Sequence, residues 1–154
     1  MRTSEEAVRD YLRARETADL ALLDEVVAPG FTHRMRGADE DRDTLFARVA
    51  QGPSVYAEMH HEIEVLLTAG DEVACQYRFR GRHVGPLPIS GSLADLYGAT
   101  QIPATGHTVE MTGMFIAVVR AGQLQSGAGE FDALGLLLQL LGHARPDPAR
   151  PADG

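Results

Sequence analysis

Hydrophobic residues change their spacing once along this chain, near Tyr56, and this change restricts the fold more than any other feature of the sequence. Before Tyr56 they recur every three or four positions, as on one face of an amphipathic helix. After Tyr56 they recur every second position, as in a strand with one buried face. Amphipathic helices that precede such a sheet are expected to cover its apolar face. The pattern therefore predicts an α+β domain with N-terminal helices packed against an antiparallel sheet.

Two helices are predicted at the N-terminus. Thr3 and Glu6 have the spacing of a capping box, which places the first helix at about residues 4–17. Asp19 can begin a second helix, and Pro29-Gly30 ends it. Both segments carry an apolar stripe, so both are expected to pack on the sheet.

A third helix is predicted over about residues 41–50, with Phe46 on its apolar face and Gly52-Pro53 at its end. Residues 31–33 lead into it through a polar connection. Three helices before the sheet are what a sheet with one covered face requires.

Three long strands are predicted after this helix. The first begins at Tyr56 and turns at residues 69–71, the second covers residues 73–82, and the third covers residues 108–120. The second strand is typical of a half-buried antiparallel strand, because it sends an apolar and a polar set of side chains to opposite faces. The pattern does not settle which face is concave. The two sets are Val73, Cys75, Tyr77 and Phe79 on one face and Ala74, Gln76, Arg78 and Arg80 on the other.

Residues 84–106 contain three prolines and four glycines and form an unusually long connection, whose middle favours one helical turn. Its apolar residues are too many for a solvated loop and too interrupted for a strand. We therefore predict that residues 84–102 fold over a cavity as a lid. In this hypothesis Leu93, Leu96 or Tyr97 occupies the interior.

The C-terminal region turns at Gly122, continues as an irregular strand and becomes a Leu-rich helix after Asp132. Its first half is too rich in glycine for a helix interior, where each Gly costs about 1 kcal/mol relative to Ala. Asp132 lies at the junction between hydrophobic residues, where a partly desolvated carboxylate is a better proton acceptor near neutral pH. Asp is also a preferred N-cap residue, so a purely structural role is the alternative. Residues 143–154 are predicted to be a disordered tail, which leaves one domain over residues 1–142.

The composition excludes several classes of partner. The 14 basic and 22 acidic residues give a net charge of -8, which argues against nucleic acid or an anionic membrane. A length of 154 residues fits one domain with a core and a cavity. The only cysteine, Cys75, cannot form an intramolecular disulfide and is interpreted as a buried hydrophobe. Because the sequence has no apolar signal region and no run of about 18 apolar residues, we expect a soluble cytoplasmic protein.

Several segments, in the same order, resemble the SnoaL-like polyketide cyclase family. The run from Asp132 to Gly142 is similar to its closing segment, in which an Asp precedes Gly-Leu-Leu and then Gln-Leu-Gly. The resemblance covers most of residues 5–142. It implies a fold of the nuclear transport factor 2 type, in which a cone-shaped, curved antiparallel sheet and three N-terminal helices enclose a cavity. The other segments are Asp19 to His33, Gly70-Asp-Glu-Val-Ala, Gly81-Arg-His83-Val-Gly85, Pro103-Ala-Thr-Gly106 and Gly122-Gln-Leu.

The resemblance implies catalysis without a metal or cofactor. Such a cyclase needs a base that removes a proton between two carbonyls, and polar groups that hold the resulting enolate. The family's catalytic Asp falls on Asp132, whose carboxyl we expect on the cavity wall within hydrogen-bond range of His83 or a water. His83 would orient Asp132 or donate to a substrate oxygen; alternatively it bonds a turn. His33 matches another family His, which faces the cavity or makes a structural hydrogen bond.

Eight further residues are candidates for the substrate pocket. Gln76 and Arg78 would line it if their face of the sheet were concave. Glu110 is either a second pocket carboxylate or a solvent-facing strand residue. Met111 and its neighbours fit either an ordinary core or a cavity for flat polycyclic substrates. The full set is Tyr11, Phe46, Gln76, Arg78, Glu110, Met111, Met114 and Phe115.

No metal site is predicted. The six histidines lack the spacing of a zinc site, and His60 and His61 point to opposite faces of a regular strand. The chain also departs from the family pattern, because Ser126 and Ala128 replace a Glu and a Trp. The missing Trp opens space in the cavity, which the long connection over residues 84–102 could fill.

The predicted function is ring closure in a polyketide-type natural-product intermediate, by an intramolecular aldol reaction with Asp132 as base. Epoxide opening by Asp132, Arg78 and Glu110 is a second hypothesis, and a non-catalytic module that binds small molecules is a third. The expected ligand is a hydrophobic small molecule. A homodimer is also predicted, because Tyr77, Phe79 or Val119 on an outer sheet face would leave apolar surface exposed.

Overall fold

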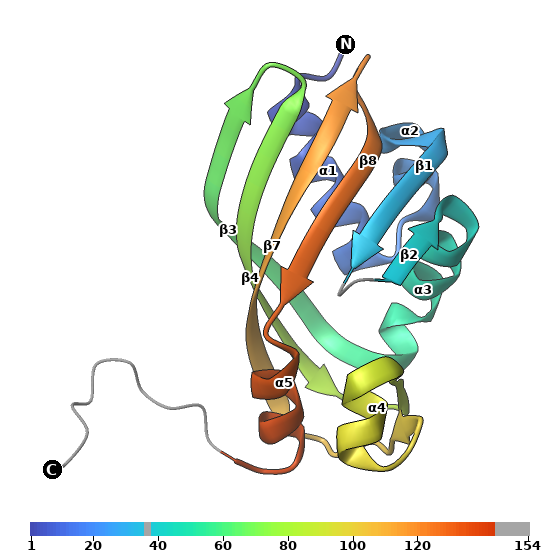
Figure 1. Ribbon diagram of the computed structural model, residues 1–154, viewed down its shortest axis with the longest axis vertical. Helices are drawn as coiled ribbons and strands as arrows, with labels where there is room; N and C mark the ends of the chain where they lie inside the picture. The colour runs from blue at the N-terminus through green and yellow to red at the C-terminus, as the bar shows by residue number, and fades with distance from the viewer. Residues whose placement is uncertain (36–37, 144–154) are drawn as a thin grey trace, which may run out of the picture.

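The computed structural model of the protein describes residues 1–35 and 38–143. A curved six-stranded sheet forms the body of the molecule, and helix α1 crosses one of its faces (Figure 1). The short helices α4 and α5 lie at one end of the sheet. This arrangement confirms the predicted α+β class and curved sheet. The predicted tail falls on residues 144–154, which lie outside the described residues.

The sheet has the strand order β2-β1-β8-β7-β4-β3. Its neighbours pair antiparallel except β1 and β8, which pair parallel, so the prediction of a purely antiparallel sheet is wrong at this one place. The chain reaches β1 before any other strand and β8 last, and this pairing places the first and last strands side by side (Figure 1). The strands are β1 (Val27–Met35), β2 (Ala38–Asp41), β3 (Tyr56–Ala69), β4 (Glu72–His83), β7 (Thr108–Arg120) and β8 (Gln123–Phe131).

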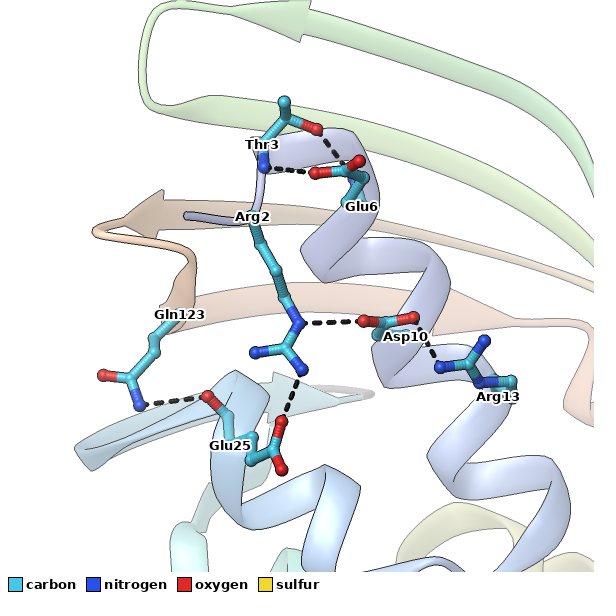
Figure 2. Close-up of polar contacts among 7 residues, drawn as sticks. All are labelled: Arg2, Thr3, Glu6, Asp10, Arg13, Glu25 and Gln123. Carbon is cyan, nitrogen blue, oxygen red and sulfur yellow. Dashed lines mark hydrogen bonds and ion pairs between the residues drawn. The ribbon is translucent and has the colours of Figure 1, made fainter.

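Helix α1 (Ser4–Thr17) has the predicted bounds, and its capping box between Thr3 and Glu6 is formed. Just before the helix, the Arg2 guanidinium donates to the carboxylates of Asp10 and Glu25 (Figure 2). Buried alanine, valine, leucine and tyrosine side chains on one side of α1 face the sheet. The cap and the arginine bridge together fix where α1 starts, and therefore which of its residues reach the interior of the domain.

Helix α2 (Leu20–Val26) begins after Asp19, whose side chain accepts from the backbone N–H of Leu22. Helix α3 (Arg42–Val55) begins after Asp41 but runs past Gly52-Pro53, so the predicted end was wrong. Proline removes one backbone donor, and the last turn survives because the Tyr56 N–H still bonds the Gly52 carbonyl and Val55 is buried.

Strands β1 and β2 form where a polar connection was predicted. In β1 the side chains of Phe31 and His33 are buried while Thr32 and Arg34 are exposed, so the strand does alternate. Pro29 and Gly30 at its start hide this alternation from a local pattern. The strand is stabilised by pairing with β8, which is far away in the sequence.

The long connection is structured rather than loop-like. It contains β5 (Leu87–Pro88), α4 (Gly91–Tyr97) and β6 (Gln101–Ile102), with β5 and β6 paired. Its base is fixed at Gly85, where a Cβ atom would come within 1.8 Å of the Ser54 carbonyl oxygen, so only glycine allows this close approach to α3. The predicted helical turn at the middle of the connection is α4.

The two faces of the sheet differ in what covers them. In β4 the residues at odd positions from Val73 to His83 are buried beneath the helices, and those at even positions face outward. The apolar set with Tyr77 and Phe79 is therefore on the inner face. The predicted exposure of Tyr77, Phe79 and Val119 on the outer face is wrong, because all three are buried in the core.

None of the helices within the described ranges is long and apolar enough to cross a membrane.

Candidate active-site cavity

A cavity of about 590 Å³ lies between the inner face of the sheet and the helices. Its wall draws on α3, on β2 to β4, on the long connection, and on single residues of α1, β1, β7, β8 and α5. The lining includes several aromatic and thioether side chains, which suit a flat apolar ligand. The principal apolar lining residues are Tyr56, Met59, Tyr77, Phe79, Met111 and Phe131.

Charged groups are few in this wall, and the best defined is an ion pair between β2 and α3. Arg48 donates to Glu40 through Nε and a terminal nitrogen, at 2.9 and 2.8 Å. Burial opposes the charge on Glu40, but the nearby His33 ring and the hydrogen bonds from Arg48 outweigh it and lower the pKa of Glu40 to about 2. Glu40 is therefore ionised, and the positive charge of Arg48 balances its negative charge. The two side chains form a fixed ion pair in the wall.

His33 lies behind this pair and not in the cavity wall described above. Its side chain is 5% exposed, and its Nδ1 atom is 3.7 Å from Glu40. The ring rests against β8, where a Cβ atom on Gly127 would come within 3.1 Å of it and one on Gly129 within 3.5 Å. The glycine-rich last strand therefore makes room for the imidazole. The alternative that His33 is held structurally fits this position better than a direct contact with substrate.

Asp132 is exposed and caps α5 (Ala133–Leu140). Its Oδ1 atom accepts the backbone N–H of Gly135 at 2.8 Å. A Cβ atom on Gly135 would lie 2.1 Å from Oδ2, so the Asp-x-x-Gly spacing is what this cap requires. The expected partial desolvation of this carboxyl is wrong, because Asp132 is exposed, and its hydrogen bond is made to the helix terminus and not to His83. A hydrogen bond from Asp132 to a water stays a prediction. Its neighbours Phe131 and Leu136 nevertheless line the cavity.

His83 is fully buried at the end of β4 and is bonded to the end of the long connection, just before β7. Its Nδ1 atom lies 3.0 Å from the Thr105 hydroxyl, and its backbone N–H and C=O bond His107 and Gly106. Burial lowers the pKa of His83, which keeps the ring neutral. Its contacts are those of a histidine that holds a turn, the structural alternative, and they do not include Asp132.

Four of the predicted pocket residues lie on the opposite face of the sheet. Gln76 and Arg78 both donate to Glu64 on β3. Glu110 and Met114 occupy the same outer face on β7, where Met114 is 58% exposed. Their assignment to the pocket is wrong, because the helices cover the face that carries Tyr77.

The other four predicted pocket residues lie on the covered side, but only Met111 lines the cavity. Tyr11 and Phe115 pack edge to face, with ring centroids 5.9 Å apart, in the core between α1 and the sheet. The Phe46 ring lies under the Arg42 guanidinium on α3. These three aromatic residues therefore stabilise the walls and do not form the surface that a ligand would meet.

Sequence reasoning missed the polar residues of the cavity wall, among them Arg15 and His61 as well as the Glu40–Arg48 pair. His61 was considered only as a metal ligand. Its signal was available, since it shares a face with Ile63 and therefore lies on the apolar side of the first long strand. Within the described ranges, no group of three or more His, Cys, Asp or Glu side chains could hold a metal ion.

Only part of the connection that was predicted to form a lid lines the cavity. Leu87, Pro88 and Ser90 of the long connection line the cavity, whereas Leu93 is buried in the core and Leu96 is 66% exposed. Tyr97 packs against the core cluster. The connection therefore closes one side of the cavity through its first residues and not through α4.

Comparison with known proteins gives a consistent result. The sequence profile of the family described as SnoaL-like polyketide cyclase matches residues 5–140. Among curated proteins, none matches the sequence significantly.

Three similar solved structures share the fold. TsrD from Streptomyces laurentii is 24% identical with a TM-score of 0.73, and the match covers 94% of this chain and 98% of TsrD. IdmH from Streptomyces antibioticus, a candidate polyketide cyclase, is 22% identical with a TM-score of 0.72, covering 90% and 99%. A SnoaL-like polyketide cyclase from Agrobacterium tumefaciens is 14% identical with a TM-score of 0.69, covering 91% and 99%.

Proposed function

We propose a ring-closing function for this chain, which belongs to the SnoaL-like polyketide cyclase family. The observation that carries the proposal is the apolar cavity of about 590 Å³ beneath the helices, walled by aromatic and methionine side chains. A flat polyketide-type natural-product intermediate would be held there away from water. Exclusion of water protects a carbanion from protonation by solvent before it reacts within the same molecule.

The proposed reaction is an intramolecular aldol closure that uses no cofactor. A base takes a proton from a carbon between two carbonyls, and the enolate carbon attacks a ketone carbon of the same molecule. The new alkoxide then recovers a proton from the protonated base, so the reaction is an isomerisation with no net gain or loss of atoms.

Asp132 is the proposed base because it matches the family's catalytic Asp. Its Oδ1 atom is engaged by the cap, while Oδ2 makes no hydrogen bond within the described part of the chain. The adjacent residue Phe131 lines the cavity, so a substrate that extends past Phe131 would meet this carboxylate. The oxygen that is free of the cap would be the one that takes the proton.

The decisive experiment replaces Asp132 by Asn and separately by Ala. Asn is as good an N-cap as Asp, so Asp132→Asn keeps the helix terminus and removes only the basic oxygen, whereas Asp132→Ala removes both. Turnover would be followed on an aromatic polyketide ester that carries an acidic CH and a ketone within reach of it. We expect Asp132→Asn to lose about 100-fold or more in kcat with unchanged stability. Full activity of Asp132→Asn would reduce Asp132 to a cap.

The exposure of Asp132 favours a second candidate, a module that binds a small molecule in the same cavity without reaction. Ligand binding without turnover by the wild-type protein would support it. The epoxide-opening hypothesis receives no such support, because Arg78 and Glu110 lie on the outer face of the sheet.

A further inference from the structure

Strand β3, at one edge of the main sheet, is deformed just before His61. Its pairing with β4 shifts register between Ala57 and His60, and Glu58 within this bulge has a left-handed φ of 56°. Bulges often re-aim a side chain next to a binding site. The helix α1 fixes the strand after the bulge, since the Glu16 carboxylate accepts the backbone N–H of His61 at 2.6 Å. The position of His61 is thus set from two elements.

The His61 side chain is 5% exposed and lies between two rings of the cavity wall. Its ring centroid is 5.5 Å from Tyr77 and 5.2 Å from Phe79. The Nδ1 atom is buried, makes no hydrogen bond with any described residue, and lies 3.5 Å from a carboxylate oxygen of Glu16. That negative charge favours the tautomer with the proton on Nδ1. The lone pair of Nε2 is then left to accept a hydrogen bond from a ligand.

Arg15, the neighbour of Glu16 on α1, also lines the cavity. No carboxylate of the described residues forms an ion pair with it, and its guanidinium lies 5.5 Å from the centroid of the Tyr11 ring. The other arginine of the wall, Arg48, is already neutralised by Glu40. In a protein with a net charge of -8, an unpaired cation in an apolar cavity is a feature that a ligand anion would satisfy.

Burial lowers the pKa of His61 to about 3, and the nearby Arg15 guanidinium contributes to this shift. The ring is therefore neutral at physiological pH. It does not add to the charge of Arg15, and the two groups differ in what they can bind. Arg15 is a donor for an anion, and His61 is an acceptor for a hydroxyl.

We propose that Arg15 and His61 form a recognition subsite for an aromatic acid, in which Arg15 binds the carboxylate and His61 accepts a hydrogen bond from a neighbouring ring hydroxyl. The subsite rests on the proposed function only in that both use the same cavity. The subsite predicts a substrate with a free carboxylate, whereas the substrate of the proposed aldol closure carries an ester. Hydroxylated aromatic acids are the ligand class that satisfies both groups at once.

The test is a binding titration with three probes, 2-naphthoate, its methyl ester and 3-hydroxy-2-naphthoate. The wild-type protein should bind the acid about tenfold or more tightly than the ester, because a charge-assisted hydrogen bond is lost in the ester. The hydroxyl should tighten binding by a further few-fold. Equal binding of acid and ester by the wild-type protein would overturn the proposal.

Two variants assign the contacts. Arg15→Gln should abolish the preference for the acid, and His61→Phe should abolish only the preference for the hydroxyl. Arg13→Gln is the matched control, because Arg13 lies on the same helix but pairs with Asp10 at the surface (Figure 2). It should behave as the wild type. An acid preference that survives Arg15→Gln would contradict the assignment.

Arg15→Lys keeps the positive charge and should keep part of the preference for the acid. It therefore tests the role of the charge even if Arg15→Gln fails to fold. Binding and turnover separate the two proposals. Tight binding of the acid without ring closure would contradict the cyclase function and support the subsite. Ring closure with no preference for the acid would support the cyclase function and contradict the subsite.

Discussion

The two faces of the central sheet are built from the same strands, but one borders the cavity and the other carries surface ion pairs. On the inner face, β4 presents Tyr77 and Phe79 to the cavity beneath the helices. On the outer face, one residue away in sequence, Arg78 pairs with Glu62 and Glu64 on β3. The comparison shows that a side chain can be one position from the site and still be separated from it by the whole thickness of the sheet.

The largest expected difference between the faces is in stability. Phe79→Ala should lower the free energy of unfolding by about 3–5 kcal/mol, because it removes a buried ring that packs on Tyr56 and His61. Arg78→Ala should cost at most about 1 kcal/mol, because its ion pairs are exposed to solvent. Denaturant unfolding of both variants measures this. Similar losses would mean that the two faces are not divided as described.

A second prediction concerns apolar residues that the outer face does expose. Leu67 on β3 and Met114 and Ile116 on β7 are 64%, 58% and 54% exposed on the two sides of β4, and we propose that they form the interface of a homodimer. Ile116→Lys should weaken dimerisation at least about tenfold by placing a charge in that interface, while Thr108→Lys at the end of the same strand should not. Sedimentation equilibrium distinguishes the outcomes, and a monomeric wild-type protein would refute the interface.

The pH dependence of stability sharpens the comparison, because the two groups whose pKa values are strongly lowered, His61 and Glu40, are on the cavity side. The pKa of His61 is lowered from 6.5 to about 3 and that of Glu40 from 4.5 to about 2. In both cases the unfolded chain binds the proton first as the pH falls, so stability is lost below about pH 6.5 for His61 and below about pH 4.5 for Glu40.

A difference of one bound proton between the folded and unfolded states changes the free energy of unfolding by about 1.4 kcal/mol per pH unit. His61→Phe should therefore flatten the profile between pH 6.5 and the onset of the Glu40 transition. His60→Phe, an exposed neighbour, provides the control. An unchanged slope in His61→Phe would show that His61 is not buried as a neutral ring.

The helices and the strands β3, β4 and β7 could be predicted from sequence because their caps and periods are local. The bounds of α1 and the start of α2 follow from Thr3 and Asp19 alone. Strand β1 could not be predicted in the same way, because its partner β8 is distant and the stability of the pair is a property of the tertiary structure.

The candidate site was less accessible to sequence reasoning. The alternating pattern placed Gln76 and Arg78 on the opposite face of the sheet from Tyr77. It did not show which of the two faces the helices cover. Three arginines at alternate positions, Arg78, Arg80 and Arg82, were the available signal that their face meets solvent. The motif that identifies Asp132 also specifies a helix cap, and a spacing cannot separate a catalytic carboxylate from a structural one.

The methionines allow the central claim, that ligands bind on the inner face, to be tested in one measurement. Met35, Met59 and Met111 line the cavity, whereas Met114 is exposed on the opposite face. Titration of methyl-labelled protein with 2-naphthoate or its methyl ester should shift the NMR signals of the three cavity methionines and leave Met114 unchanged. A shift confined to Met114, or saturating binding with no change at the cavity methionines, would contradict the account.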